Sequence, residues 1–150
     1  MSASTKLATA VQALSHLAGT SSESQNSDVI SQATGINASR LRNILSMLAR
    51  AGIVNSERGL SGGFRLAKTP EEIHLQEIYC AVETKKAFHL DVNRRGTGND
   101  NLPSSVNGYF LSLFSEIQVE IEDKMRAITL RDILNSIHNH PPTPTSSVRG

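Results

Sequence analysis

The chain has 150 residues, a formal net charge of +1, and a composition that is 38% hydrophobic and 19% charged. The composition is that of a globular protein, and the chain is long enough for one core and one added element. No apolar run approaches the roughly 18 residues that a membrane span needs, which excludes a membrane partner. A single cysteine excludes an intrachain disulfide. Together with the lack of a secretory signal pattern, it predicts a cytoplasmic protein.

The charges are unevenly distributed. Residues 1–70 hold seven of the fifteen Lys and Arg but only three of the fourteen Asp and Glu, so the remaining residues are net acidic. A basic half joined to an acidic half fits a DNA-binding unit attached to a module that faces a partner.

Apolar residues at helical spacing predict a first helix that begins at Ser4 or Thr5 and ends at Gly19. They are Leu7, Ala10, Val11, Leu14, Leu17 and Ala18.

The stretch from Ser27 to Lys68 reads as helix, tight turn, longer helix, strand, glycine-rich tip and strand. Ser27 is a good N-cap for the first of these helices, and Gly35 is the residue expected where a helix ends in a left-handed turn. Asn37 is then expected to cap the second helix. Two helices joined this closely have the geometry of a helix-turn-helix.

The second helix divides into an apolar and a polar face. Its buried stripe consists of Leu41, Ile44, Leu45 and Leu48. The polar face suits DNA, because Arg can pair with guanine, Asn with adenine, and Ser or a helix N-terminus with phosphate. The candidate DNA-binding residues on this helix are Asn37, Ser39, Arg40, Arg42 and Asn43.

A hairpin directly after such a helix is a wing, which would lie over the DNA backbone or minor groove. Its candidate DNA-binding residues are Arg58, Gly59, Ser61, Gly62 and Arg65. A three-helix core with a solvated hairpin could share the apolar positions. The combined order of turn glycine, Asn cap, polar face and basic glycine-rich hairpin favours nucleic-acid binding.

These residues also carry a resemblance. The segment Arg58-Gly59-Leu60-Ser61-Gly62-Gly63-Phe64-Arg65-Leu66 fits the pattern R-G-x-x-G-G-[FY]-x-L. It resembles the wing of the Rrf-two family of bacterial winged-helix transcription regulators, and the likeness covers roughly residues 5 to 135. The resemblance implies DNA contacts at the positions of Ser39, Arg42, Asn43 and Arg58.

In the cluster-bearing branch of that family, three cysteines in the segment that corresponds to residues 85–103 hold an iron–sulfur cluster. Here this segment has no cysteine, so no cluster and no other cofactor is expected. The one cysteine, Cys80, falls in a short helix expected to start at His74. It could be a redox-sensitive thiol, but a small core or boundary residue is the favoured interpretation.

A long helix is expected to begin near Ser104 or Ser105. Its apolar stripe consists of Val106, Phe110, Leu113, Phe114, Ile117, Ile121 and Met125, and Tyr109, Leu111, Val119 and Ile128 widen it. A helix this apolar on several sides favours packing against its own chain and against the same helix of a second subunit. The alternative is an intrachain core helix.

A capping box from Thr129 to Asp132 predicts a last short helix. A Pro- and Ser-rich tail over residues 139–150 is expected to be disordered. His138 and His140 suggest a frayed end rather than a metal site, because no third ligand is indicated nearby.

The sequence therefore predicts a mainly α chain with a small β-hairpin. Residues 1–84 form a winged helix-turn-helix, 85–103 a loop, and 104–138 the dimerisation helix and last helix. The expected function is a homodimeric regulator, more often a repressor, that binds a palindromic operator in double-stranded DNA. The alternatives are a protein-interaction module, or a regulator that senses a small molecule or thiol oxidation. No catalytic motif is present, and the sequence names no effector.

Overall fold

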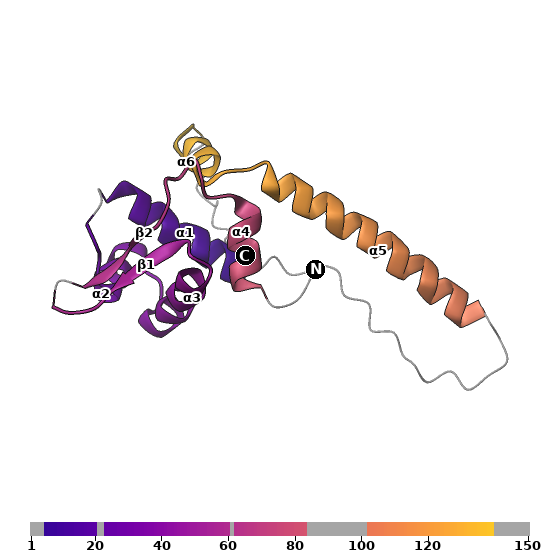
Figure 1. Ribbon diagram of the computed structural model, residues 1–150, viewed down its shortest axis with the longest axis horizontal. Helices are drawn as coiled ribbons and strands as arrows, with labels where there is room; N and C mark the ends of the chain where they lie inside the picture. Colours follow the sequence, from indigo (N-terminus) through magenta and orange to yellow (C-terminus); the bar gives the residue numbers. More distant parts are fainter. Residues whose placement is uncertain (1–4, 21–22, 61, 84–101, 140–150) are drawn as a thin grey trace, which may run out of the picture.

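The computed structural model describes residues 5–20, 23–60, 62–83 and 102–139, and the side chains of residues 102–104 are not described (Figure 1). Its elements are α1 (Thr5–Gly19), α2 (Ser27–Thr34), α3 (Ala38–Arg50), β1 (Val54–Glu57), β2 (Gly63–Leu66), α4 (Leu75–Val82), α5 (Leu102–Arg126) and α6 (Leu130–Asn139). The predicted mainly α chain with a hairpin and a long C-terminal helix is confirmed.

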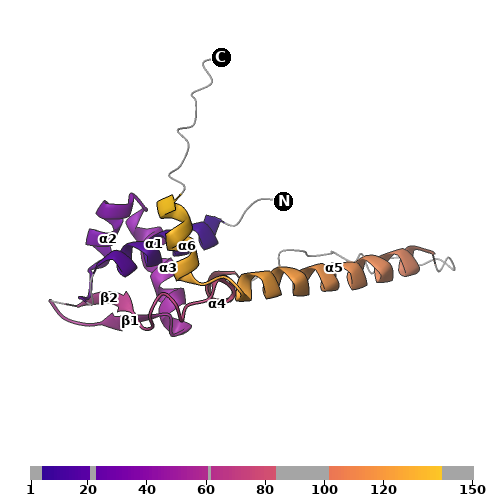
Figure 2. The same ribbon diagram turned by 90° about the horizontal axis from the view of Figure 1, so that it is seen from above.

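One apolar core holds the globular body together. Helix α1 packs against α2, α3, α4 and α6, and the hairpin lies beside it (Figure 2). The predicted stripe on α3 is fully buried in this core. Other completely buried side chains come from every part of the body: Leu14, Ile30, Ile53, Ile73, Ile78 and Leu130.

The connection between α2 and α3 has the predicted helix-turn-helix features. Gly35 adopts a left-handed φ of 73° and its N–H donates to the Ser31 carbonyl, which ends α2. Asn37 caps α3, since its side chain accepts from the backbone N–H groups of Ser39 and Arg40.

The start of α2 differs from the prediction. Its N-cap is Asn26, whose Oδ1 accepts from the Asp28 N–H at 2.7 Å, and Ser27 is the first helical residue. Both residue types are good caps, and the extended backbone of Asn26 decides between them. Of the apolar residues on α2, Ile30 is buried, whereas Val29 and Ala33 are exposed.

The hairpin is antiparallel, with Val54 opposite Leu66 and Glu57 opposite Gly63. A third segment joins it, because Gln25 and Phe64 exchange two backbone hydrogen bonds of 2.8 and 2.9 Å. Gly63 permits this approach, since a Cβ at that position would collide with the backbone of Gln25. The wing is thus fixed to the segment that precedes α2.

Helices α4 and α6 begin side by side. The Leu75 N–H donates to Ile128 and the Leu130 N–H to Ile73, each at 2.8 Å. The capping box of α6 is confirmed by reciprocal bonds between Thr129 and Asp132 of 3.1 and 2.9 Å. These bonds tie the end of α5 back to the globular body.

Two element boundaries differ from the prediction. Helix α5 begins at Leu102, ahead of the expected Ser104 or Ser105, and α6 continues through Asn139. His138 lies within α6 with its Nδ1 3.0 Å from the Leu134 carbonyl, rather than in a frayed end. His140 and the rest of the expected tail lie outside the described residues, as does the loop segment 85–101.

Candidate nucleic-acid interface

The outer face of α3 presents the predicted polar side chains. Ser39, Arg40, Arg42 and Asn43 are all exposed, on the side opposite the buried leucines. Asn37 has a structural task at the helix start, because its Oδ1 lies 3.0 Å from the Ser39 nitrogen and 3.2 Å from the Arg40 nitrogen. The cap orients the first turn of α3, and the exposed donors follow it on one face.

An acidic residue that sequence reasoning missed lies beside this face. Asp28, in the first turn of α2, approaches Arg42 with 3.6 Å between Oδ1 and Nη2. The pairing is tertiary, since it joins the two helices of the helix-turn-helix. No local pattern indicates it.

The wing tip holds Arg58 and Gly59, both exposed, and Gly62, which is half-buried. Gly59 has a φ of 111°, which a side chain would disfavour. A Cβ on Gly62 would press on the backbone of residues 57–59. Ser61 lies outside the described residues. The tip therefore needs glycine at both positions to turn this tightly.

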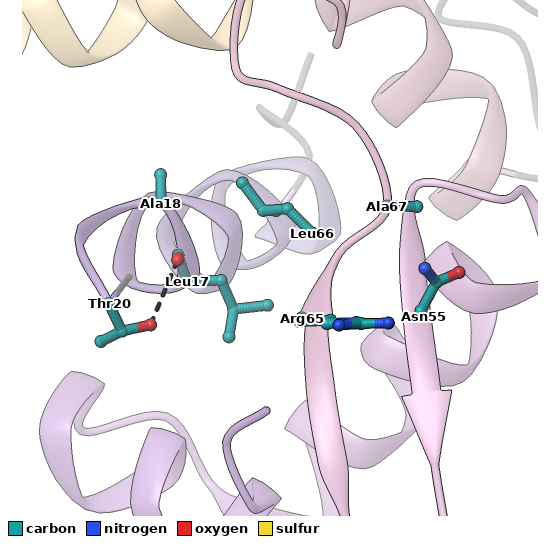
Figure 3. Close-up of a pocket in the computed structure, with 7 residues that line it drawn as sticks. All are labelled: Leu17, Ala18, Thr20, Asn55, Arg65, Leu66 and Ala67. Atoms are coloured by element: carbon teal, nitrogen blue, oxygen red, sulfur yellow. Dashed lines mark hydrogen bonds between the residues drawn. The ribbon is translucent and has the colours of Figure 1, made fainter. Parts of the chain in front are cut away.

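Arg65 does not belong to the tip. It lies on β2 opposite Asn55 and pairs with Glu57 at 3.1 Å, and Glu57 also accepts from the Ser24 hydroxyl at 2.6 Å. Arg65 also lines a hollow of about 330 Å³ between the end of α1 and the hairpin. Figure 3 draws the residues around this hollow. The hollow is lined by Leu17, Ala18, Thr20, Asn55, Arg65, Leu66 and Ala67. The predicted basic residues thus occupy two separate parts of the hairpin.

Helix α5 projects from the body as an arm (Figures 1 and 2). Along its predicted stripe, Val106 and Phe110 are exposed, Leu113, Phe114, Ile117 and Ile121 are half-buried, and Met125 is buried. Aromatic rings cluster toward its N-terminal end, where the ring centroid of Phe110 lies 5.5 Å from that of Tyr109 and 5.8 Å from that of Phe114. Within the described residues, no helix is long and apolar enough to span a membrane.

A family model described as "Rrf2: Iron-dependent Transcriptional regulator" matches residues 3–136. The chain belongs to the Rrf2 (Rrf-two) family. Its members are DNA-binding transcription regulators, and this explains the combination of an exposed α3 face with a glycine-rich wing.

Known proteins agree with this assignment. YwgB of Bacillus subtilis, named as an HTH-type transcriptional regulator, is 30% identical over 118 residues, which are 76% of this chain and 71% of YwgB. The structure of T. potens IscR has a TM-score of 0.68 and 25% identity, covering 95% of this chain and 93% of that one. CymR, the global cysteine regulator of B. subtilis, has the same fold, with a TM-score of 0.65 at 20% identity over 91% and 98% of the two chains.

The iron dependence in the family description raises the question of a metal cluster. Iron–sulfur clusters are held mainly by cysteine thiolates, and the whole sequence contains only Cys80. Cys80 is exposed on α4 rather than in the core, with the Gln76 amide nitrogen 3.3 Å from its Sγ. No cluster of three metal-binding side chains occurs among the described residues. The donor set therefore does not fit the usual cluster of the family.

The carboxyl groups with a shifted pKa lie away from α3. The Arg131 guanidinium lowers the pKa of Glu71, and backbone and side-chain donors of Thr69 lower that of Glu72. The backbone and hydroxyl of Thr129 likewise lower the pKa of Asp132. Glu72 closes the turn that begins at Thr69, Glu71 pairs with α6, and Asp132 caps α6, so these shifts concern the fold rather than the candidate interface.

Proposed function

We propose that this Rrf2-family chain is a homodimeric regulator that binds a palindromic operator in double-stranded DNA without an iron–sulfur cluster. The observation that carries the proposal is the exposed face of α3, which presents Arg42 and Asn43 beside a capped helix start. Both are side chains that can read base edges in the major groove.

The remaining candidates would position the protein on the DNA. Ser39, Arg40 and the amides at the start of α3 suit phosphate contacts. Arg58 at the exposed wing tip suits the backbone or the minor groove. Arg65 contributes more indirectly, because it pairs with Glu57 across the hairpin.

The arm supports a dimer. Val106, Tyr109 and Phe110 stay exposed on α5, and a second copy of the same helix would cover them. Two α3 helices related by a two-fold axis would then read two half-sites, as operators of pseudo-palindromic sequence require. A dimer that covers a promoter excludes polymerase without further machinery, so repression is the proposed outcome.

The experiment is selection of bound duplexes from a random library with wild type, Arg42→Ala and Arg131→Ala. Arg131 is an exposed arginine on α6, so its variant controls for the loss of one positive charge. Arg42→Ala should cost about 1–3 kcal/mol and relax specificity at one base pair in each half-site. Arg131→Ala should recover the wild-type palindrome.

Two results would contradict the proposal. A uniform loss across all sequences would make Arg42 a phosphate contact. Recovery of no sequence above background would favour a protein-interaction module, whose binding should lack the steep, log-linear salt dependence of DNA complexes.

The proposed lack of a cluster has its own test. Protein purified without oxygen and incubated with iron and sulfide should retain no stoichiometric iron, and its operator affinity should be unchanged. Stoichiometric iron with a change in affinity would contradict this part of the proposal.

A further inference from the structure

Asp28 forms an ion pair with Arg42, the arginine proposed to read bases. Its carboxylate lies 3.6 Å from Arg42, and the side chains are 69% and 60% exposed. Asp28 belongs to α2 and Arg42 to α3, and these two helices pack against each other. A negative charge is therefore held on the exposed side of the helix-turn-helix, where the phosphate backbone of DNA would lie.

The charge of Asp28 lies in the first turn of α2, where it complements the helix dipole, but this does not require a pair with Arg42. The cap of α2 is made by Asn26, which accepts from the backbone N–H of Asp28 and leaves its side chain out of the cap. An exposed ion pair contributes little to stability, because solvent screens both charges. The pair with Arg42 therefore needs a reason other than holding the fold together.

The donor geometry of arginine suggests that reason. A guanidinium carries five N–H donors, of which two suffice for the bidentate pair with guanine O6 and N7. A remaining donor can face a carboxylate at the same time, and this fixes the plane of the guanidinium. A phosphate contact is less favourable in the same place, because the negative carboxylate repels the negative phosphate, whereas guanine carries no net charge.

We propose that Asp28 is a specificity-determining residue, which holds Arg42 for base reading and disfavours its use as a phosphate contact. The inference rests on the proposed function of Arg42. Arg40 lies on the same helix but differs from Arg42. Among the described residues, Arg42 forms an ion pair and Arg40 forms none. A phosphate at Arg40 would therefore meet no paired carboxylate, whereas a phosphate at Arg42 would meet the charge of Asp28.

The test compares Asp28→Asn with Glu71→Gln. Glu71 also pairs with an exposed arginine, Arg131, at 2.8 Å, but between the turn before α4 and α6. Each variant removes one negative charge and one arginine–carboxylate pair. Dissociation constants are measured for the selected operator and for a scrambled duplex of equal length at one salt concentration.

Asp28→Asn should tighten binding to the scrambled duplex and weaken binding to the operator or leave it unchanged. The specificity ratio, which is the dissociation constant for the scrambled duplex divided by that for the operator, should fall about three- to tenfold. Asp28→Glu should restore part of the ratio. Glu71→Gln should change both affinities by the same small factor. An unchanged ratio in Asp28→Asn, or an equal fall in Glu71→Gln, would overturn the proposal.

Repeating the comparison in an Arg42→Ala background separates this inference from the proposed function. There, Asp28→Asn should no longer alter the ratio, and an undiminished effect would mean that Asp28 acts without Arg42 and overturn the inference. If Arg42→Ala itself keeps the wild-type base preference, the proposed role of Arg42 fails, and the role of Asp28 fails with it. If Arg42→Ala loses specificity but Asp28→Asn does not, only the inference about Asp28 fails.

Discussion

The globular body and the α5 arm differ in how far their apolar side chains are buried. In the body, large side chains from α1, α2, α3, α4 and α6 are completely buried against one another. On α5, by contrast, several remain exposed: Val106, Tyr109, Phe110, Leu111 and Val119. The body is therefore closed by contacts within the chain, whereas the arm keeps several apolar side chains exposed. Changes in the body should affect unfolding, and changes in the arm should affect association.

The largest expected effect tests the closed core. Leu45→Ala on α3 removes a fully buried side chain, and the resulting cavity should lower the free energy of unfolding by about 2–5 kcal/mol. Leu111→Ala makes the same chemical change at an exposed position on the arm, where the loss should stay below about 1 kcal/mol. Urea denaturation of both variants measures the difference. Equal losses would show that the arm is packed as tightly as the core.

The next effect tests the open face of the arm. Phe110→Glu places a charge in the proposed apolar interface, and we expect the dimer dissociation constant to rise about a hundredfold, equivalent to roughly 2.7 kcal/mol. Ser112→Glu, an exposed polar position on α5, is the control and should leave association unchanged. Sedimentation equilibrium gives both constants. A wild-type constant for Phe110→Glu would assign the dimer contact to another surface.

Glycine-to-alanine substitutions should change stability in opposite directions in the two regions. Gly63→Ala directs a methyl group at the backbone of Gln25 and should destabilise the wing by about 1–3 kcal/mol. Gly108→Ala lies within α5 with open space around its Cβ position and should stabilise the helix by about 0.5–1 kcal/mol. Thermal unfolding measures both. Destabilisation by Gly108→Ala would mean that something already packs closely on the arm.

The same contrast explains what the sequence could predict. Features set by neighbours along the chain were predictable: the helical stripe on α3, the left-handed Gly35 and the Asn37 cap all follow from spacing and residue type. The winged-helix fold followed from their order. The exposed polar face of α3 was predictable by elimination once the buried stripe was assigned.

Features set by contacts between distant segments were not predictable. The choice of Asn26 over Ser27 as a cap depends on backbone conformation, and the pair between Asp28 and Arg42 joins two helices. Gly63 resembled another turn glycine, yet its close approach to Gln25 fixes the wing to the body. Arg65 was expected to lie over DNA together with Arg58, and the sequence did not indicate its pair with Glu57 on the neighbouring strand. For Asp28, Gly63 and Arg65 the missing information was the position of a second segment.

The smallest expected effect concerns acid stability at the start of α4, where the end of the arm meets the body. Partial burial raises the pKa of Glu77. Two donors outweigh it and hold the pKa below its ordinary value of 4.5: the backbone N–H of His74, 2.9 Å from Oε2, and the Lys68 ammonium, 2.7 Å from Oε1. Because the folded state binds this proton less readily, the stabilisation is present above pH 4.5 and is lost as the pH falls below it. Glu77→Gln should therefore flatten the decline of unfolding free energy on the acid side of pH 4.5. Lys68→Met should flatten it only in part, since the His74 donor remains. Denaturation at several pH values gives the slopes, and parallel curves for wild type and Glu77→Gln would assign the acid sensitivity of the body to other carboxyl groups.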